Sequence, residues 1–114
     1  MNQDAPMTFA LMKLLVLQAQ HGDSDAFNAL YNEYARSMYR FALLRVKDSM
    51  IAEDLVQNVW LKVTKRLKRL NDISLFRSWL FRALRWEILD WLKSKKIIFM
   101  KQMRTMIHYC LATI

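Results

Sequence analysis

Glycine and proline are almost missing from this chain: each occurs once in 114 residues. Tight turns between β-strands depend on these residues, so the sequence offers few places where strands could reverse direction. Leu, Ala, Met, Lys and Arg, which favour helices, are frequent instead. With 54% apolar residues the chain should also fold. We therefore predict one all-α domain, a compact bundle of three main helices plus an N-terminal helix, joined by short connections.

The spacing of apolar residues predicts where these helices lie. They are expected at about residues 8–20, 25–46, 50–70 and 76–96. The first is apolar nearly all round, so it should be buried on several sides. Gly22 ends it, and Asp23 or Ser24 can cap the second helix by accepting hydrogen bonds from its free N–H groups. Asp48 or Ser49 can cap the third helix in the same way.

The third helix has two different faces when residues are placed at about 100° intervals. Its inner face is apolar and holds Ile51, Leu55, Val59, Val63 and Leu70. Its outer face is polar apart from one leucine and holds Asp54, Gln57, Asn58, Leu61, Lys65 and Lys68. A single exposed leucine is ordinary in a folded protein. Because its neighbours include uncharged polar side chains, Leu61 is alternatively a docking point for another helix.

The fourth helix mixes aromatic and basic residues: residues 76–96 hold three tryptophans and six Lys or Arg. Its core face is predicted to hold Leu80, Leu84, Ile88, Trp91 and Leu92. A second, basic face holds Ser78, Arg82, Arg85, Lys93 and Lys96. Trp79 and Trp86 follow the edge of this basic face. They either fill the core or form a platform for unstacked bases of single-stranded nucleic acid, whose phosphates Lys and Arg would neutralise.

Positive charge is concentrated in the second half of the chain. Residues 1–61 hold five Lys or Arg and seven Asp or Glu, a balance of −2, whereas residues 62–114 hold thirteen and three, a balance of +10. Such asymmetry indicates a polyanionic partner, either nucleic acid or an anionic membrane surface, unless the basic face is merely solvated. The sequence alone leaves these alternatives open.

A cofactor- or metal-dependent enzyme does not fit this sequence. His108 and Cys110 lie two residues apart, but no second His/Cys pair completes a tetrahedral zinc site. One glycine excludes a glycine-rich phosphate loop. We therefore expect a non-enzymatic protein without cofactor or metal. A single cysteine, no signal-peptide cleavage motif and no run of the ~18 apolar residues that span a membrane favour the cytoplasm.

Three stretches resemble region 2 of bacterial sigma factors, specifically those of the extracytoplasmic-function (ECF) group. They are "GDSDAFNALYNEYARSMYRFALLRV", "AEDLVQNVWLKV" and "FRSWLFRALRWEILDWLKSKK", in the order and spacing of that family. The resemblance implies a transcription-initiation subunit without catalytic activity of its own. It implies binding to the clamp helices of the beta-prime subunit of core RNA polymerase. It also implies capture of flipped bases on the non-template strand of the minus-ten promoter element, and allows for an anti-sigma factor as a further partner.

Carried over residue by residue, the resemblance assigns two sets of contacts. The polymerase-facing set is Asp54, Gln57, Asn58 and Leu61. The set for melted promoter DNA is Asn71, Asp72, Ser74, Arg77, Trp79, Arg82, Arg85, Trp86 and Lys93. Of the two aromatic residues in this set, we expect Trp79 to be structural and Trp86 to touch the nucleic acid.

The chain departs from the family pattern in two places. The family often has "ARN" where this helix has "LRW", so Trp86 stands at a position where a polar residue is expected near the DNA. The region 2-like domain should cover residues 8–96, which leaves 97–114 as a tail too short for region 4, the helix-turn-helix domain that reads the minus-35 element. The chain thus resembles a sigma factor cut short. The alternative function is a basic helical interaction protein that binds an anionic membrane, or single-stranded nucleic acid without polymerase.

Overall fold

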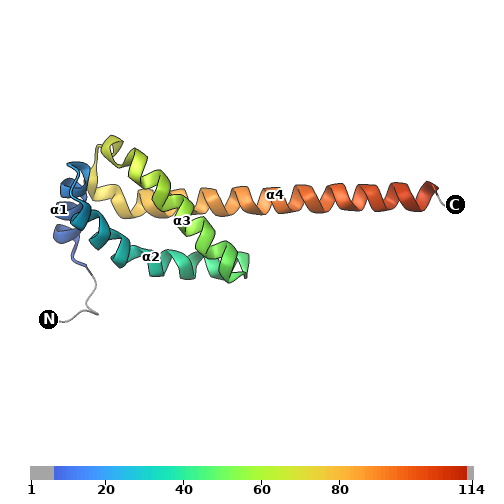
Figure 1. Ribbon diagram of the computed structural model, residues 1–114, viewed down its shortest axis with the longest axis horizontal. Coiled ribbons are helices and arrows are strands. Elements are labelled where there is room, and N and C mark those ends of the chain that lie inside the picture. Colours follow the sequence, from blue (N-terminus) through green and yellow to red (C-terminus); the bar gives the residue numbers. More distant parts are fainter. Residues whose placement is uncertain (1–6, 113–114) are drawn as a thin grey trace.

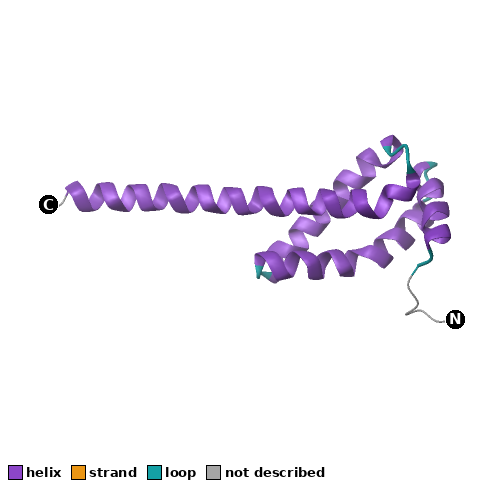
Figure 2. Ribbon diagram, turned by 180° about the vertical axis from the view of Figure 1, so that it is seen from behind, coloured by secondary structure: helices purple, strands orange, loops and turns teal. Residues whose placement is uncertain are grey.

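The helices form in the predicted order, and the computed structural model describes the backbone of residues 7–112 and the side chains of residues 7–95. The elements are α1 (Phe9–Gln20), α2 (Ser24–Val46), α3 (Ser49–Arg66), the 3₁₀ turns η1 (Leu67–Arg69) and η2 (Ile73–Leu75), and α4 (Phe76–Ala112). No strand occurs within residues 7–112, and short loops connect the helices (Figure 2). The all-α prediction is therefore confirmed.

Side chains at the helix starts explain the boundaries. Asp23 caps α2 by accepting from the N–H groups of Asp25 and Ala26, at 2.9 and 3.1 Å. Asp48 caps α3 by accepting from the N–H groups of Met50 and Ile51. In both places the aspartate is the cap and the following serine is the first helical residue, because a carboxylate accepts two backbone N–H groups at once.

The core lies between α2, α3 and the first half of α4, and α1 covers one end of this bundle (Figure 1). Its fully buried large side chains come from all four helices: Val16, Leu30, Met38, Val59, Phe76, Leu80 and Leu84. An ion pair between Lys62 and Glu87 ties α3 to α4 at the surface. Each longer helix thus contributes one apolar stripe, as the three- and four-residue spacing predicts.

The prediction that α1 is buried on several sides is wrong. Only Met12 and Val16 are buried in this helix, whereas Leu11, Leu14 and Leu17 are 45%, 50% and 43% exposed. The reason is position: α1 packs on α2 and on the two 3₁₀ turns, which all lie on one side of it. An apolar helix at the end of a bundle has too few neighbours to bury its outer face.

The fourth helix is longer than the segment 76–96 that was read from the sequence. Its backbone continues to Ala112 and projects far beyond the bundle (Figure 1), which gives the molecule extents of 70 × 30 × 19 Å. Nothing after Gly22 is a glycine or proline, so no helix-breaking residue interrupts it. Leu92, predicted on the core face, is 39% exposed because α2 ends at Val46 and no longer covers α4 there.

The third helix is shorter than predicted and ends at Arg66, followed by η1 and an extended Leu70. Gln20, the last residue of α1, holds this segment: its side-chain amide donates to the carbonyl oxygens of Leu67 and Leu70 at 3.0 and 2.8 Å. Within the described part of the chain, none of the helices combines the length and apolarity needed to cross a bilayer.

Candidate functional site

The outer face of α3 brings the first predicted set of residues together. Asp54, Gln57, Asn58 and Leu61 are all exposed, and the Leu61 side chain is 62% accessible. They occupy two neighbouring turns of one helix face, because α3 turns its other side to the core. Leu61 is thus an apolar side chain in a polar setting, fixed on a rigid helix.

A groove beside this face adds residues from α2 that the sequence reasoning missed. It has a volume of about 340 Å³ and is lined by Tyr31, Ala35, Arg36, Tyr39, Glu53, Val56 and Gln57. The Gln57 side-chain amide donates to the Tyr31 hydroxyl at 2.7 Å, which joins the two helices. Tyr31 is supported from below by the buried Trp60 ring, 5.2 Å away edge to face. The four-residue spacing of Tyr31, Ala35 and Tyr39 is the signal that could have revealed this second stripe on α2.

The connection between α3 and α4 is fixed by hydrogen bonds within it and by a buried residue that follows it. The Asp72 carboxylate accepts hydrogen bonds from the backbone N–H and the hydroxyl of Ser74, and it caps η2. Phe76, which follows at once, is fully buried. Asp72 and Ser74, both predicted to contact DNA, therefore also shape the connection. Asn71 is exposed at its start.

The two tryptophans of the basic face have different surroundings. The Trp79 ring is half-buried, packs on the core and lies 6.0 Å from the Phe76 ring. Trp86 is 59% exposed. Arg82 and Lys93 are exposed on the same side of α4 as Trp86, one turn before it and two turns after it. These three side chains, Arg82, Trp86 and Lys93, form what we term the α4 outer strip.

The structure places Arg77 and Arg85 away from this strip, on the side of α4 that faces α2. The Arg85 guanidinium lies 5.9 Å from the centre of the Phe41 ring of α2. Arg77 lies 5.9 Å from the Phe81 ring. The single basic face predicted from the sequence is therefore divided between two sides of the helix.

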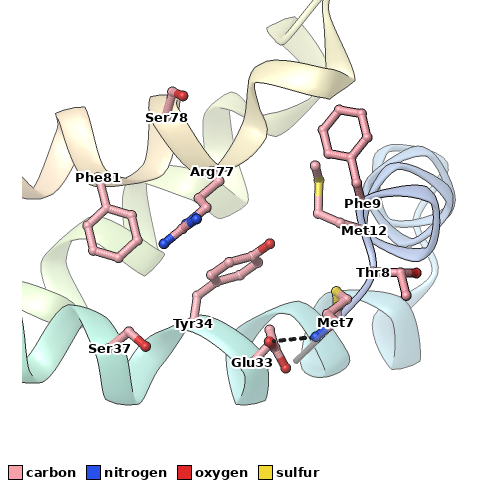
Figure 3. A pocket seen from close by; sticks show the side chains of 10 residues that line it. All are labelled: Met7, Thr8, Phe9, Met12, Glu33, Tyr34, Ser37, Arg77, Ser78 and Phe81. Atoms are coloured by element: carbon pink, nitrogen blue, oxygen red, sulfur yellow. Dashed lines mark hydrogen bonds between the residues drawn. The ribbon is translucent and has the colours of Figure 1, made fainter. Parts of the chain in front are cut away.

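Arg77 instead lines a pocket of about 490 Å³ between the start of α1, α2 and the first turns of α4 (Figure 3). Tyr34 and Arg77 point into it, and the Glu33 carboxylate accepts a hydrogen bond from the Met7 N–H at 3.0 Å. Burial raises the pKa of the Tyr34 phenol, Glu33 raises it further, and Arg77 opposes the change. Among the described side chains no group of three His, Cys, Asp or Glu is placed to hold a metal ion.

Residues 30–97 match the family described as Sigma-70 region 2. The chain belongs to this family. The match begins in α2, covers all of α3 and ends in α4, close to where that helix leaves the bundle. The outer face of α3, the 71–74 connection and the α4 outer strip all lie inside the region 2 match, whereas α1 lies before it.

Curated relatives of this region 2 chain are sigma factors. It is 34% identical over 88 residues to the ECF RNA polymerase sigma factor BldN of Streptomyces coelicolor, an alignment that covers 76% of this chain and 33% of that protein. It is 30% identical over 74 residues to the ECF RNA polymerase sigma factor SigX of Bacillus subtilis, covering 65% and 38%. A probable RNA polymerase sigma factor of Haemophilus influenzae is 40% identical over 58 residues, covering 51% and 30%.

The region 2 chain spans about a third of the length of these relatives. No solved structure gives a significant match. The resemblance to ECF sigma factors that the three sequence stretches indicated is confirmed by the family match and by two ECF relatives.

Proposed function

We propose that this protein acts in transcription initiation as a sigma factor does, without enzymatic activity of its own. It would bind core RNA polymerase through α3 and engage the melted minus-ten element through α4. The observation that carries this proposal is the region 2 match across α2, α3 and α4. In this reading residues 8–96 are the functional domain and 97–114 a tail, and the protein works in the cytoplasm, where the polymerase is.

The proposed polymerase contact is the outer face of α3 together with the α2–α3 groove. An exposed leucine among polar side chains suits a partner helix, because its burial on binding is favourable and the polar rim keeps the free protein soluble. The beta-prime clamp helices are the partner we propose. The centre of the contact is Leu61, with Asp54, Gln57 and Asn58 as its rim. An anti-sigma factor, where one exists, would compete by covering one of these faces.

The proposed DNA contact is the α4 outer strip with the nearby 71–74 connection. An exposed indole can stack on an unpaired base, which contributes ~1–3 kcal/mol per base, and Arg and Lys neutralise phosphates. Trp86 would supply the stack while Arg82 and Lys93 follow the backbone of the non-template strand. Intact duplex hides the faces of its bases, so this strip favours melted DNA.

The test of the polymerase contact is a pull-down of core RNA polymerase by the full chain. Replacing both Leu61 and Gln57 with Ala should weaken retention of the polymerase while circular dichroism shows unchanged helix content. Leu14→Ala is the matched control, since Leu14 is a similarly exposed leucine on α1, outside the proposed contact. Undiminished binding by the folded double variant would refute the α3 assignment.

A further inference from the structure

A second groove lies between the C-terminal part of α2 and the middle of α4, apart from both surfaces proposed above. It is lined by Phe41, Arg45, Arg85, Ile88, Leu89 and Leu92. Its volume of about 380 Å³ is within the range of well-formed ligand pockets. We term it the α2–α4 groove. Neither the outer face of α3 nor the α4 outer strip contributes a residue to it.

The floor of this groove is apolar and firmly packed. Ile88 is 3% exposed, and the Phe41 ring packs edge to face on Phe81 at 5.7 Å. Leu89 and Leu92 stand above the floor, 47% and 39% exposed. One exposed leucine needs no explanation, but two that border an apolar hollow form a patch of the kind that marks a binding groove.

The walls of the groove carry positive charge in fixed positions. The Arg45 guanidinium stacks 3.4 Å from the centre of the Phe41 ring, and its Nη1 donates to the Phe41 carbonyl oxygen at 2.9 Å. Arg85 reaches toward the same ring from α4. Over its whole length α4 holds eight Lys or Arg and two Asp or Glu. Because Arg45 is held against the Phe41 ring, less side-chain entropy is lost when it binds an anion.

We infer that the α2–α4 groove binds an acidic amphipathic helix of a partner protein. Two helices that diverge leave a concave strip, which a third helix fills with residues spaced three and four apart. Its apolar residues would cover Leu89 and Leu92. Its carboxylates would meet Arg45 and Arg85, which can hold a carboxylate with two parallel hydrogen bonds.

Charge and shape disfavour the other candidate occupants. A second copy of this chain would bring another α4, with a net charge of +6 from its eight basic and two acidic residues, against the same arginines. Nucleic acid could contact the arginines but has no aliphatic surface to cover Leu89 and Leu92. A flat membrane surface would touch the rim of the groove and miss its floor.

This inference does not depend on the polymerase or DNA contacts proposed above, because it uses different residues. It is tested with the full chain and a labelled designed peptide of about 18 residues, which has leucines along one face and Glu on both flanks. A twin peptide carries Lys in place of every Glu. Fluorescence anisotropy should show saturable binding of the acidic peptide, at least about tenfold tighter than that of the basic twin.

Substitutions inside the groove and at a control position on α1 show where the peptide binds. Leu89→Arg should lower the affinity for the acidic peptide by roughly tenfold or more, because it puts a charge where an apolar contact is required. Leu14→Arg, which alters an equally exposed leucine on α1, should leave binding unchanged. Arg45→Glu should lower the affinity for the acidic peptide and raise the affinity for the basic twin. Circular dichroism confirms that each variant keeps its helix content, and Arg45→Glu covers the case in which Leu89→Arg fails to fold.

Four outcomes would overturn the inference. The first is equal affinity for the two peptides, and the second is an equal loss of affinity with Leu14→Arg and Leu89→Arg. The third is a dimer in sedimentation that Leu89→Arg abolishes, and the fourth is binding of anionic vesicles that also depends on Leu89. The third would assign the groove to a second copy of the chain, and the fourth to a membrane.

Discussion

Trp79 and Trp86 are seven residues apart on one helix, yet their environments predict different roles. Trp79 packs on the core beside Phe76, whereas Trp86 is mostly exposed. Seven residues make nearly two full turns, so the two side chains leave the helix in directions only about 20° apart. Because α4 has neighbours on one side only, this small difference decides which ring is buried. An exposed indole leaves apolar surface in water, which is unfavourable, and contributes little to the fold. Trp86 is therefore the better candidate for a contact.

Alanine replacements separate these two roles. Trp79→Ala should lower the free energy of unfolding by about 3 kcal/mol, the lower end for loss of a large core side chain. Trp86→Ala should change it by less than ~0.5 kcal/mol, as surface changes do, and weaken binding to bubble DNA by ~1–3 kcal/mol. Urea denaturation and anisotropy with labelled bubble DNA measure the two effects. If Trp86→Ala melted far earlier but bound bubble DNA normally, Trp86 would be structural instead.

Gln20 is the residue on which the position of the α3–α4 connection most depends. Its side-chain amide donates to two carbonyl oxygens: that of Leu67, which also accepts the Leu70 N–H, and that of Leu70. Gln20→Ala should destabilise the fold by about 1–2 kcal/mol, since two partly buried hydrogen bonds are lost and the Leu70 carbonyl oxygen loses the donor described for it. Gln20→Glu should cost more, because a carboxylate cannot donate and repels both oxygens. Gln18→Ala and Gln18→Glu, on the exposed side of the same helix, are the controls in thermal denaturation. Equal effects at both positions would refute the proposed role.

At the scale of helices, what could be predicted from sequence is what depends on local chemistry. The starts of α2 and α3 follow from Asp23 and Asp48, which accept backbone N–H groups wherever the helix packs. The stripes through Leu80, Leu84 and Ile88 follow from helical spacing. The buried side of α1 could not be predicted, because a helix that is apolar nearly all round has no continuous polar face to show which side has neighbours. The grooves are a different case, because each is formed by two helices: the spacing of Tyr31, Ala35 and Tyr39 marks a stripe on α2 but does not show that α3 lies beside it.

The extension of α4 leads to a prediction about the element itself. Because its backbone beyond residue 96 projects away from the bundle, ending the chain after Lys96 should leave the unfolding free energy within ~0.5 kcal/mol of the full chain. The helical circular dichroism signal should fall by the contribution of the removed residues. Urea denaturation of the chain and its 1–96 version makes the comparison. A large loss of stability would mean that residues 97–114 belong to the folded domain, against the boundary proposed above.

At the scale of the whole molecule, the charge asymmetry and the fold agree on where a polyanion would bind. The basic second half of the sequence includes α4, while six of the ten Asp and Glu residues lie between residues 23 and 54, in α2, the start of α3 and the caps of these two helices. The separation of Arg82 from Arg77 and Arg85, which were all expected to contact DNA, could not be read from the sequence. It depends on which neighbouring ring each guanidinium finds, Phe81 for Arg77 and Phe41 for Arg85.

This arrangement predicts how the free protein responds to salt. Phosphate contacts release counterions, so the logarithm of the DNA binding constant should fall linearly with the logarithm of salt concentration, and bubble DNA should bind more tightly than intact duplex. Arg82→Gln should reduce the slope by about 0.7–0.9, the value for one phosphate contact. Arg36→Gln, an exposed arginine on α2 outside the proposed DNA contact, should leave the slope unchanged. Titrations of labelled bubble DNA at several KCl concentrations provide the measurement. Equal slope changes for both variants would show that DNA binding depends only on the net charge of the protein. Binding to anionic vesicles but not to bubble DNA would favour a membrane partner.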